Sequence, residues 1–182
     1  MKALIVYFSQ TGNTKQIAES IHEEISKHAE ADIASVRRVD PGTLNQYDLL
    51  FVGAPCHSSD LAPPVKGFLE RLPLSSSFKL AGFFTHATYM PDHDGQGRNI
   101  HDKWAGRCHL TFEEVSKEKN VEFLGYFNCM GKASPDIEAF IKREVITDEV
   151  EWEKYLPELR SHPDTIDIKN AKNFALEILG KL

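Results

Sequence analysis

Cysteine is scarce in this chain of 182 residues, which contains only Cys56, Cys108 and Cys129. An odd number of widely spaced cysteines does not build a disulfide framework, so we expect a reducing, cytoplasmic setting. Long hydrophobic runs are absent as well. No segment is long and apolar enough to span a bilayer, and the opening apolar stretch is too short for a signal peptide. We therefore expect no membrane insertion.

Positive charge is also in deficit. The chain has 21 Lys and Arg against 27 Asp and Glu, which gives a formal net charge of -6 at pH 7. This balance argues against nucleic acid or an anionic membrane as a partner. An acidic surface suits basic protein partners, although it also serves solubility alone. The length fits one compact domain over residues 1–182.

The motifs of several enzyme classes are missing from the sequence. No GxGxxG follows the first apolar segment, which disfavours a bound dinucleotide, and no GxxxxGK[ST] is present, which excludes a P-loop NTPase. CxxC, C-x5-R and GxSxG are absent too, so thiol oxidoreductase, cysteine phosphatase and α/β-hydrolase chemistry lack support. Because no acid, base or nucleophile stands out, we predict no catalytic residue.

Histidine and aspartate gather loosely in the middle of the chain, but their spacing matches no metal-binding motif. Solvated loop side chains are the commoner case, so we predict no metal site. The loose cluster comprises His86, His93, His101 and His109 together with Asp92 and Asp94. Two cysteines, Cys56 and Cys129, each follow a predicted strand. A redox-active pair stays open there, beside the commoner interpretation of small buried side chains.

Apolar segments alternate with segments of helical spacing five times. This order predicts an α/β fold with a five-stranded parallel sheet and helices on both faces. Its topology favours the strand order 2-1-3-4-5, in which ligands bind at the carboxyl ends of strands one and three. An additional helical segment of about residues 130–166, acidic between 144 and 158, precedes the last helix. The predicted strands are 3–8, 33–36, 49–53, 80–84 and 121–127, and one long helix is predicted over about 100–119.

The densest polar signal follows the first strand. Hydroxyls, amides and a glycine stand where a helix begins and leaves backbone N–H groups without partners. Those donors and the helix dipole favour a phosphate group. The alternative is an ordinary capped helix start. The candidate phosphate-binding residues are Ser9, Gln10, Thr11, Gly12, Asn13 and Thr14.

These residues carry a family resemblance. The segment Tyr7 to Thr14 resembles the phosphate-binding signature of flavodoxins, and Gly53-Ala54-Pro55 with the helix that follows is similar to the next flavodoxin block. Further along, Cys129-Met130-Gly131-Lys132 and His162-Pro163-Asp164 resemble a flavodoxin-like subgroup of anaerobic bacteria and archaea. The resemblance implies the flavodoxin-like fold and FMN as the cofactor, with its phosphate on residues 9–14.

The same resemblance places the flavin ring between the loops after Gly53 and Phe84. The first loop offers Pro55, Cys56, His57 and Ser58, and the second offers Thr85, His86, Ala87 and Tyr89. Flavodoxins often stack a Trp and a Tyr on the flavin, but Trp104 and Trp152 lie outside both loops. Tyr89 is therefore the stacking candidate, with an edge-of-core tyrosine as the alternative.

Glycine is lacking in the first of these loops, between Gly53 and Gly67. In many flavodoxins a peptide beside the flavin flips on one-electron reduction, and glycine makes that flip cheap because it tolerates positive φ. A flip near His57 and Ser58 would cost roughly 1 kcal/mol more. We expect a less stabilised half-reduced flavin. Carboxylates in the loops, Asp60, Asp92 and Asp94, would lower the flavin potential.

The leading functional hypothesis is a flavodoxin-type electron carrier that passes electrons between redox protein partners, for which basic or iron–sulfur proteins would fit. The first alternative is an FMN-dependent NAD(P)H reductase of quinones or similar small acceptors. The second alternative is a flavin-free binding module on the same fold. Reduction by NAD(P)H alone separates the first two. The sequence leaves a monomer and a dimer equally open.

Overall fold

A computed structural model describes residues 1–93 and 95–182, and it contains a parallel sheet of five strands. The strands are β1 (Lys2–Tyr7), β2 (Glu30–Ser35), β3 (Leu49–His57), β5 (Lys79–His86) and β6 (Phe123–Met130). Their order is β2-β1-β3-β5-β6, and each neighbouring pair is parallel. Counted along the parallel strands, this is the predicted order 2-1-3-4-5. The predicted fold class is therefore confirmed.

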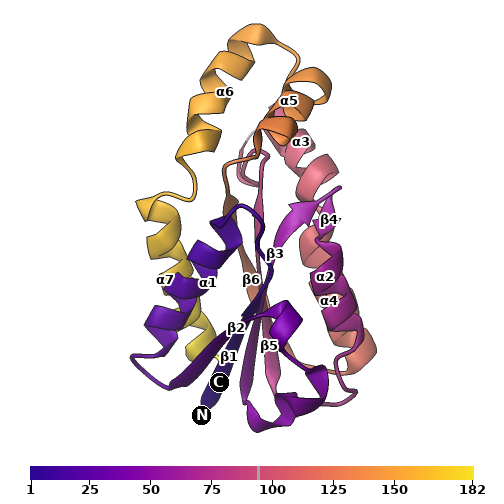
Figure 1. Cartoon of the computed structure of the whole chain (residues 1–182), viewed down its shortest axis with the longest axis vertical. Coiled ribbons are helices and arrows are strands. Elements are labelled where there is room, and N and C mark those ends of the chain that lie inside the picture. Colours follow the sequence, from indigo (N-terminus) through magenta and orange to yellow (C-terminus); the bar gives the residue numbers. More distant parts are fainter. Residues whose placement is uncertain (94) are drawn as a thin grey trace.

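Helices cover both faces of the sheet (Figure 1). On one face lie α1 (Asn13–Ile25) and α7 (Thr165–Leu179), and on the other lie α2 (Pro63–Glu70) and α4 (Arg107–Lys119). Two short 3-10 helices, η1 (Val36–Arg38) and η2 (Pro41–Gln46), lie between β2 and β3. We call the sheet with α1, α2, α4 and α7 the body of the molecule.

The apolar strands are continuous because both of their faces are buried. In β3, Leu50 and Val52 pack on the α2–α4 side, whereas Leu49 and Phe51 pack on the α1–α7 side. Successive side chains of a strand point to opposite faces, so one uninterrupted apolar run supplies both layers of core.

A third group of helices lies beyond the carboxyl ends of the strands (Figure 1). It consists of α3 (Gly95–Ala105), α5 (Pro135–Glu144) and α6 (Glu149–Ser161). We call these three helices the cap. They surround a hydrophobic cluster of their own, built from Tyr89, Ile100, Met130, Ile141, Ile146, Trp152, Tyr155 and Leu159.

The prediction of one helix over about 100–119 is wrong, because the chain forms α3 and α4 with Gly106 between them. A Cβ atom on Gly106 would lie 2.4 Å from the backbone oxygen of Asp102, so the tight junction needs glycine. The break lets α3 pack in the cap while α4 packs on the sheet.

The loop predicted after Gly53 also differs from the structure. Strand β3 continues to His57, turns at Ser58 and Ser59, and pairs with a short antiparallel strand, β4 (Asp60–Leu61). The predicted long loop is therefore a two-residue hairpin between β3 and β4. Among the described residues, no helix is long and apolar enough to cross a membrane.

Candidate functional site

A cavity of about 650 Å³ lies at the carboxyl ends of β1, β3 and β5, between the body and the cap. Its volume is in the range of small-molecule sites. One end is polar and belongs to the start of α1, and the other end is apolar and belongs to α3 and α5. The described lining residues are Gln10, Thr11, Asn13, Pro55, Cys56, His57, Ser58, Ser59, Thr85, His86, Ala87, Thr88, Trp104, Gly131, Lys132, Ala133, Ser134, Asp136, Ile137, Phe140, Ile141 and Val145.

The polar end is built by the turn that leads into α1. Gly12 adopts φ 95°, a left-handed conformation that glycine reaches without strain, and its N–H donates to Ser9 Oγ at 3.1 Å. No side chain caps α1. The N–H groups of its first turn therefore keep their capacity to bind an anion.

Two side chains of this turn hold the turn in place. Asn13 Nδ2 donates to Lys132 O at 2.8 Å and to Thr11 Oγ1 at 3.0 Å, and the Thr14 and Thr85 hydroxyls are bonded at 2.8 Å. Thr14 is buried and, like Ser9 and Gly12, is not among the residues that line the cavity. Of the six candidate phosphate-binding residues, Gln10, Thr11 and Asn13 line it directly.

The middle of the cavity is bounded by the β3–β4 hairpin. Ser58 and Ser59 have φ values of 50° and 68°, the paired positive values of a type I′ turn. The turn is held by Asp60, whose carboxylate accepts from Lys66 Nζ at 2.5 Å, from Thr111 Oγ1 at 2.6 Å and from the Leu61 N–H. These bonds draw Asp60 away from the cavity, and they outweigh burial in lowering its pKa.

A thiol and an imidazole of the hairpin face the cavity. The Cys56 thiol donates to Trp104 O at 3.2 Å, and burial lowers the pKa of His57 below its usual range. Cys56 lies next to Cys108, and its thiol, together with burial, raises the pKa of the Cys108 thiol. Cys129 packs on the opposite face of the sheet, with α1 and α7. The structure therefore rules out the Cys56–Cys129 pair considered from the sequence.

His86 lies at the end of β5, where burial keeps it neutral and hydrogen bonds fix its tautomer. The Thr88 N–H lies 3.4 Å from His86 Nδ1, which must accept, so Nε2 carries the proton and donates to Asn128 Oδ1 at 3.1 Å. The rings of His86 and His101 meet edge to face at 4.9 Å. Burial, followed by the neighbouring His101, lowers the pKa of His86 to about 3. It presents an uncharged wall to the cavity at neutral pH.

Tyr89, the stacking candidate, belongs to the core of the cap and does not line the cavity. Its hydroxyl donates to Glu151 Oε1 at 2.8 Å, and its ring packs edge to face on Tyr155 at 4.9 Å. The aromatic side chains that do line the cavity are Trp104 and Phe140, whose rings meet at 82° and 5.5 Å. Sequence reasoning set Trp104 aside because it lies on a helix, not in a loop.

The loose histidine cluster comes together only in part, because His86 and His101 meet but His93 and His109 pack on tyrosine rings. His93 packs on Tyr89, and His109 stacks on Tyr126. Asp92 is exposed, and Asp94 lies outside the described residues.

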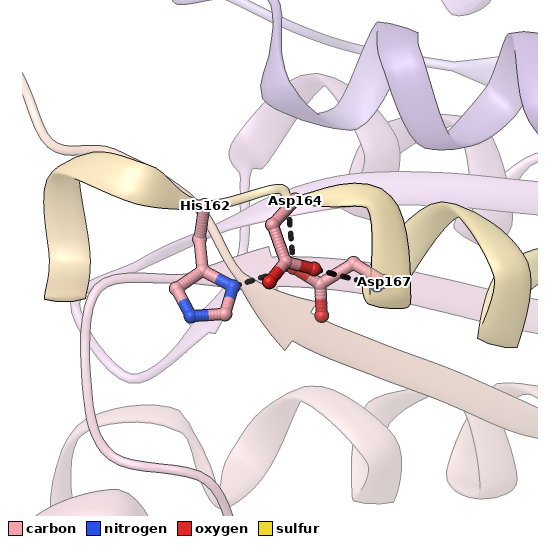
Figure 2. Close-up of side chains that lie close together, drawn as sticks. All are labelled: His162, Asp164 and Asp167. Atoms are coloured by element: carbon pink, nitrogen blue, oxygen red, sulfur yellow. Dashed lines mark hydrogen bonds and ion pairs between the residues drawn. The ribbon is translucent and has the colours of Figure 1, made fainter.

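A different group, His162, Asp164 and Asp167, has ligand atoms within 4.8 Å of one another (Figure 2). Its contacts cap α7: Asp164 accepts from the N–H groups of Ile166 and Asp167, and Asp167 Oδ2 accepts from the Asp164 N–H at 2.9 Å. His162 Nδ1 lies 2.5 Å from the same Asp167 oxygen. The reciprocal bonds of a capping box account for this cluster.

Comparisons with known proteins agree with this architecture. A family model for the flavodoxin domain matches residues 4–176. The chain is 31% identical to the flavodoxin-like domain-containing protein BilS of Clostridioides difficile, with 100% of this chain and 98% of that protein covered. It is 28% identical to an uncharacterized protein of Methanocaldococcus jannaschii, over 98% of this chain and 99% of that one.

Among solved structures, oxidised flavodoxin 2 of Bacillus cereus superposes with a TM-score of 0.63. The two chains cover each other fully at 19% identity, so this likeness concerns the fold. The family match over nearly the whole sequence, with the relative of 31% identity, shows that the chain belongs to the flavodoxin domain family.

Proposed function

We propose that this protein binds FMN in the cavity and acts as a flavodoxin-type electron-transfer protein. The observation that carries the proposal is the uncapped start of α1 at the polar end of the cavity, beside two loops at the switch point of the sheet. When bound, FMN supplies the redox chemistry, and the protein sets its binding, orientation and access.

The chain's residues divide this work by position. The first-turn N–H groups of α1, with Gln10 and Thr11, would hold the phosphate, and Lys132 adds the cationic side chain of the cavity lining. The hairpin at Ser58 and the strand end at His86 would flank the ring. His86 is neutral and hydrogen bonded on both nitrogens. It would therefore help to position the flavin ring without exchanging a proton with it.

Two choices remain within this proposal. The protein partners of a carrier would be redox proteins, and the negative net charge favours basic or iron–sulfur ones. The second candidate function is an FMN-dependent reductase of a small acceptor. The cap favours it, since α5 covers the cavity with side chains and leaves room for a small molecule.

Titration of the purified protein with FMN, followed by visible absorbance and flavin fluorescence, tests the proposal. We expect one FMN per chain. Gly12→Ala should weaken FMN binding about tenfold, because a Cβ meets no atom there and only the backbone conformation is strained. Gly67→Ala is the matched control, since its Cβ also has open space but its φ is ordinary.

No FMN binding to the unaltered protein would contradict the proposal and favour the flavin-free module. Rapid flavin reduction by NAD(P)H without a second protein would favour the reductase over the carrier. Equal FMN affinity of the Gly12→Ala and Gly67→Ala variants would contradict the proposal that the phosphate binds at the start of α1.

A further inference from the structure

The cavity has a second half that the phosphate loop and the two ring loops do not build. Its walls come from α3, from α5 and from the residue that follows α5: Trp104, Ile137, Phe140, Ile141 and Val145. All five side chains are apolar or aromatic. None of these side chains belongs to the two clusters that form the core of the body. Four of them belong to the cluster of the cap or pack against it, and Ile137 is exposed.

Charge distinguishes this half from the other end. Lys132 is the only Lys or Arg among the described lining residues, and its backbone is tied to Asn13 of the phosphate turn. The apolar half carries a carboxylate, Asp136, in the first turn of α5. The two histidines of the lining, His57 and His86, have lowered pKa values and are uncharged near pH 7.

These charges bear on the class of ligand. An anionic ligand in the apolar half would lose its hydration without gaining a cationic partner, which is costly. A dinucleotide diphosphate fits poorly for this reason. A neutral apolar molecule loses little on leaving water and gains apolar contact area.

The shape of the walls favours a flat molecule. The rings of Trp104 and Phe140 stand nearly perpendicular, at 82°, and form a corner with one aromatic face on each side. Lys103 Nζ lies 5.1 Å from the centre of the Trp104 ring and is not among the cavity lining residues. A planar ligand can stack on one ring and meet the edge of the other.

We propose that the apolar half of the cavity binds a neutral, planar, apolar small molecule of the quinone class next to the FMN site. This inference rests on the proposed function for what lies at the other end of the cavity, and it names the acceptor class of the reductase candidate. It assigns Phe140 and Trp104 as the binding surface and Ile137 as part of the entrance, since Ile137 is 47% exposed.

The test measures binding of two planar quinones to the FMN-loaded protein by equilibrium dialysis. One is 2,3-dimethyl-1,4-naphthoquinone, which is neutral and, being fully substituted, does not alkylate Cys56. The other is anthraquinone-2-sulfonate, which carries a permanent negative charge. We expect the neutral quinone to bind at least tenfold more tightly.

Variants connect the binding to the cap. Phe140→Ala should weaken binding of the neutral quinone about tenfold, since an aromatic face is lost. Ile137→Glu should weaken it by at least as much by bringing a charge to the entrance. Val150→Glu is the matched control and should leave it unchanged, because Val150 is also an exposed apolar residue of the cap but does not line the cavity.

The outcomes separate this inference from the proposed function. If FMN binds but the neutral quinone does not, or binds no better than the sulfonate, the inference is wrong and the function stands. If Ile137→Glu and Val150→Glu behave alike, the quinone binds elsewhere and the inference is wrong. If FMN fails to bind while the flavin-free protein shows the expected quinone preference and variant effects, the apolar site stands and the function falls.

Discussion

The body and the cap of this protein bury hydrophobic side chains in different ways. In the body, each strand feeds two layers of core, and residues such as Phe51 and Ile17 have no exposed surface. In the cap, the cluster is smaller and is held by hydroxyl bonds, from Tyr155 to Ala87 O and from Tyr89 to Glu151. From this contrast we expect the body to supply most of the stability, while both regions line the cavity.

We therefore expect the cavity between these two regions to have one rigid wall and one wall of lower stability. The rigid wall consists of the strand ends and the start of α1, and the second wall consists of α3 and α5. Four experiments test this contrast, and their expected effects fall from about 4 kcal/mol to less than 1 kcal/mol.

The largest effect should come from the centre of the body. Phe51 is fully buried in β3, and its ring meets Phe174 of α7 edge to face at 6.1 Å. Phe51→Ala should lower the free energy of unfolding by about 3–5 kcal/mol, measured by urea denaturation. Leu176→Ala, an exposed position of the same α7, should change it by less than about 0.5 kcal/mol. Similar losses in the free energy of unfolding for the two variants would contradict the expectation that the buried core of the body supplies most of the stability.

The next effect concerns the junction of body and cap, where His86 of β5 meets His101 of α3. The pKa of His86 is lowered to about 3, against about 6.5 in an unfolded chain. The unfolded state therefore binds more protons between these values, so the free energy of unfolding falls as the pH drops below about 6.5. This histidine alone should remove about 2 kcal/mol between pH 7 and pH 5.

Denaturation curves at several pH values, compared with the variant His86→Gln, check this expectation. A glutamine keeps a donor for Asn128 and does not titrate. The pH dependence should become shallower in the variant by the stated amount. Parallel curves for both proteins would mean that His86 is not held neutral in the folded state.

A smaller effect should stay within the cap. Tyr155 is buried in α6, and its hydroxyl donates to Ala87 O at 2.8 Å. Tyr155→Phe leaves that carbonyl without its partner and should cost about 1 kcal/mol. Hydrogen exchange should quicken in α5 and α6 and remain unchanged in β1 and β3. Equal acceleration in the sheet would show that body and cap unfold as one unit.

The smallest effect is a gain in stability at the rigid wall. Ser58 has φ 50°, so Ser58→Gly should raise the free energy of unfolding by about 0.5 kcal/mol, net of the flexibility that glycine adds to the unfolded chain. Ser75→Gly, at φ 53° and outside the cavity lining, should give a smaller gain, because it also removes the hydroxyl that accepts from Asn120 Nδ2 at 3.0 Å. Stepwise photoreduction with FMN should then yield more half-reduced flavin in the Ser58 variant only. The same yield of half-reduced flavin in both variants would mean that the hairpin conformation does not affect the flavin.

Much of the architecture was predictable because it depends on local patterns. The apolar runs of β1, β3 and β5 and the helical spacing of Ile17 and Ile21 specify a parallel sheet covered on both faces. The polar turn from Ser9 to Thr14 predicted which helix start lies at the ligand edge. None of these inferences needs knowledge of distant contacts.

Other features depend on contacts that sequence spacing does not reveal. Strand β4 exists because Cys56 and His57 pair with Leu61 and Asp60, and Asp60 is fixed by Lys66 and Thr111. Thr14 was predicted among phosphate-binding residues, yet its hydroxyl is bonded to Thr85, 71 residues away. The turn of the β3–β4 hairpin consists of Ser58 and Ser59. It lacks the Asn-Gly or Asp-Gly pair from which a two-residue hairpin is usually predicted.

The amino-acid sequence alone predicted the five-unit fold and the polar turn that precedes α1. It did so because strand alternation, helix spacing and helix-start chemistry are properties of neighbouring residues. The side chains that cover the cavity could be identified only from the folded chain. Folding moves Tyr89 into the core of the cap and brings Trp104 and Phe140 together from separate helices, and packing of helices is a property of the whole chain.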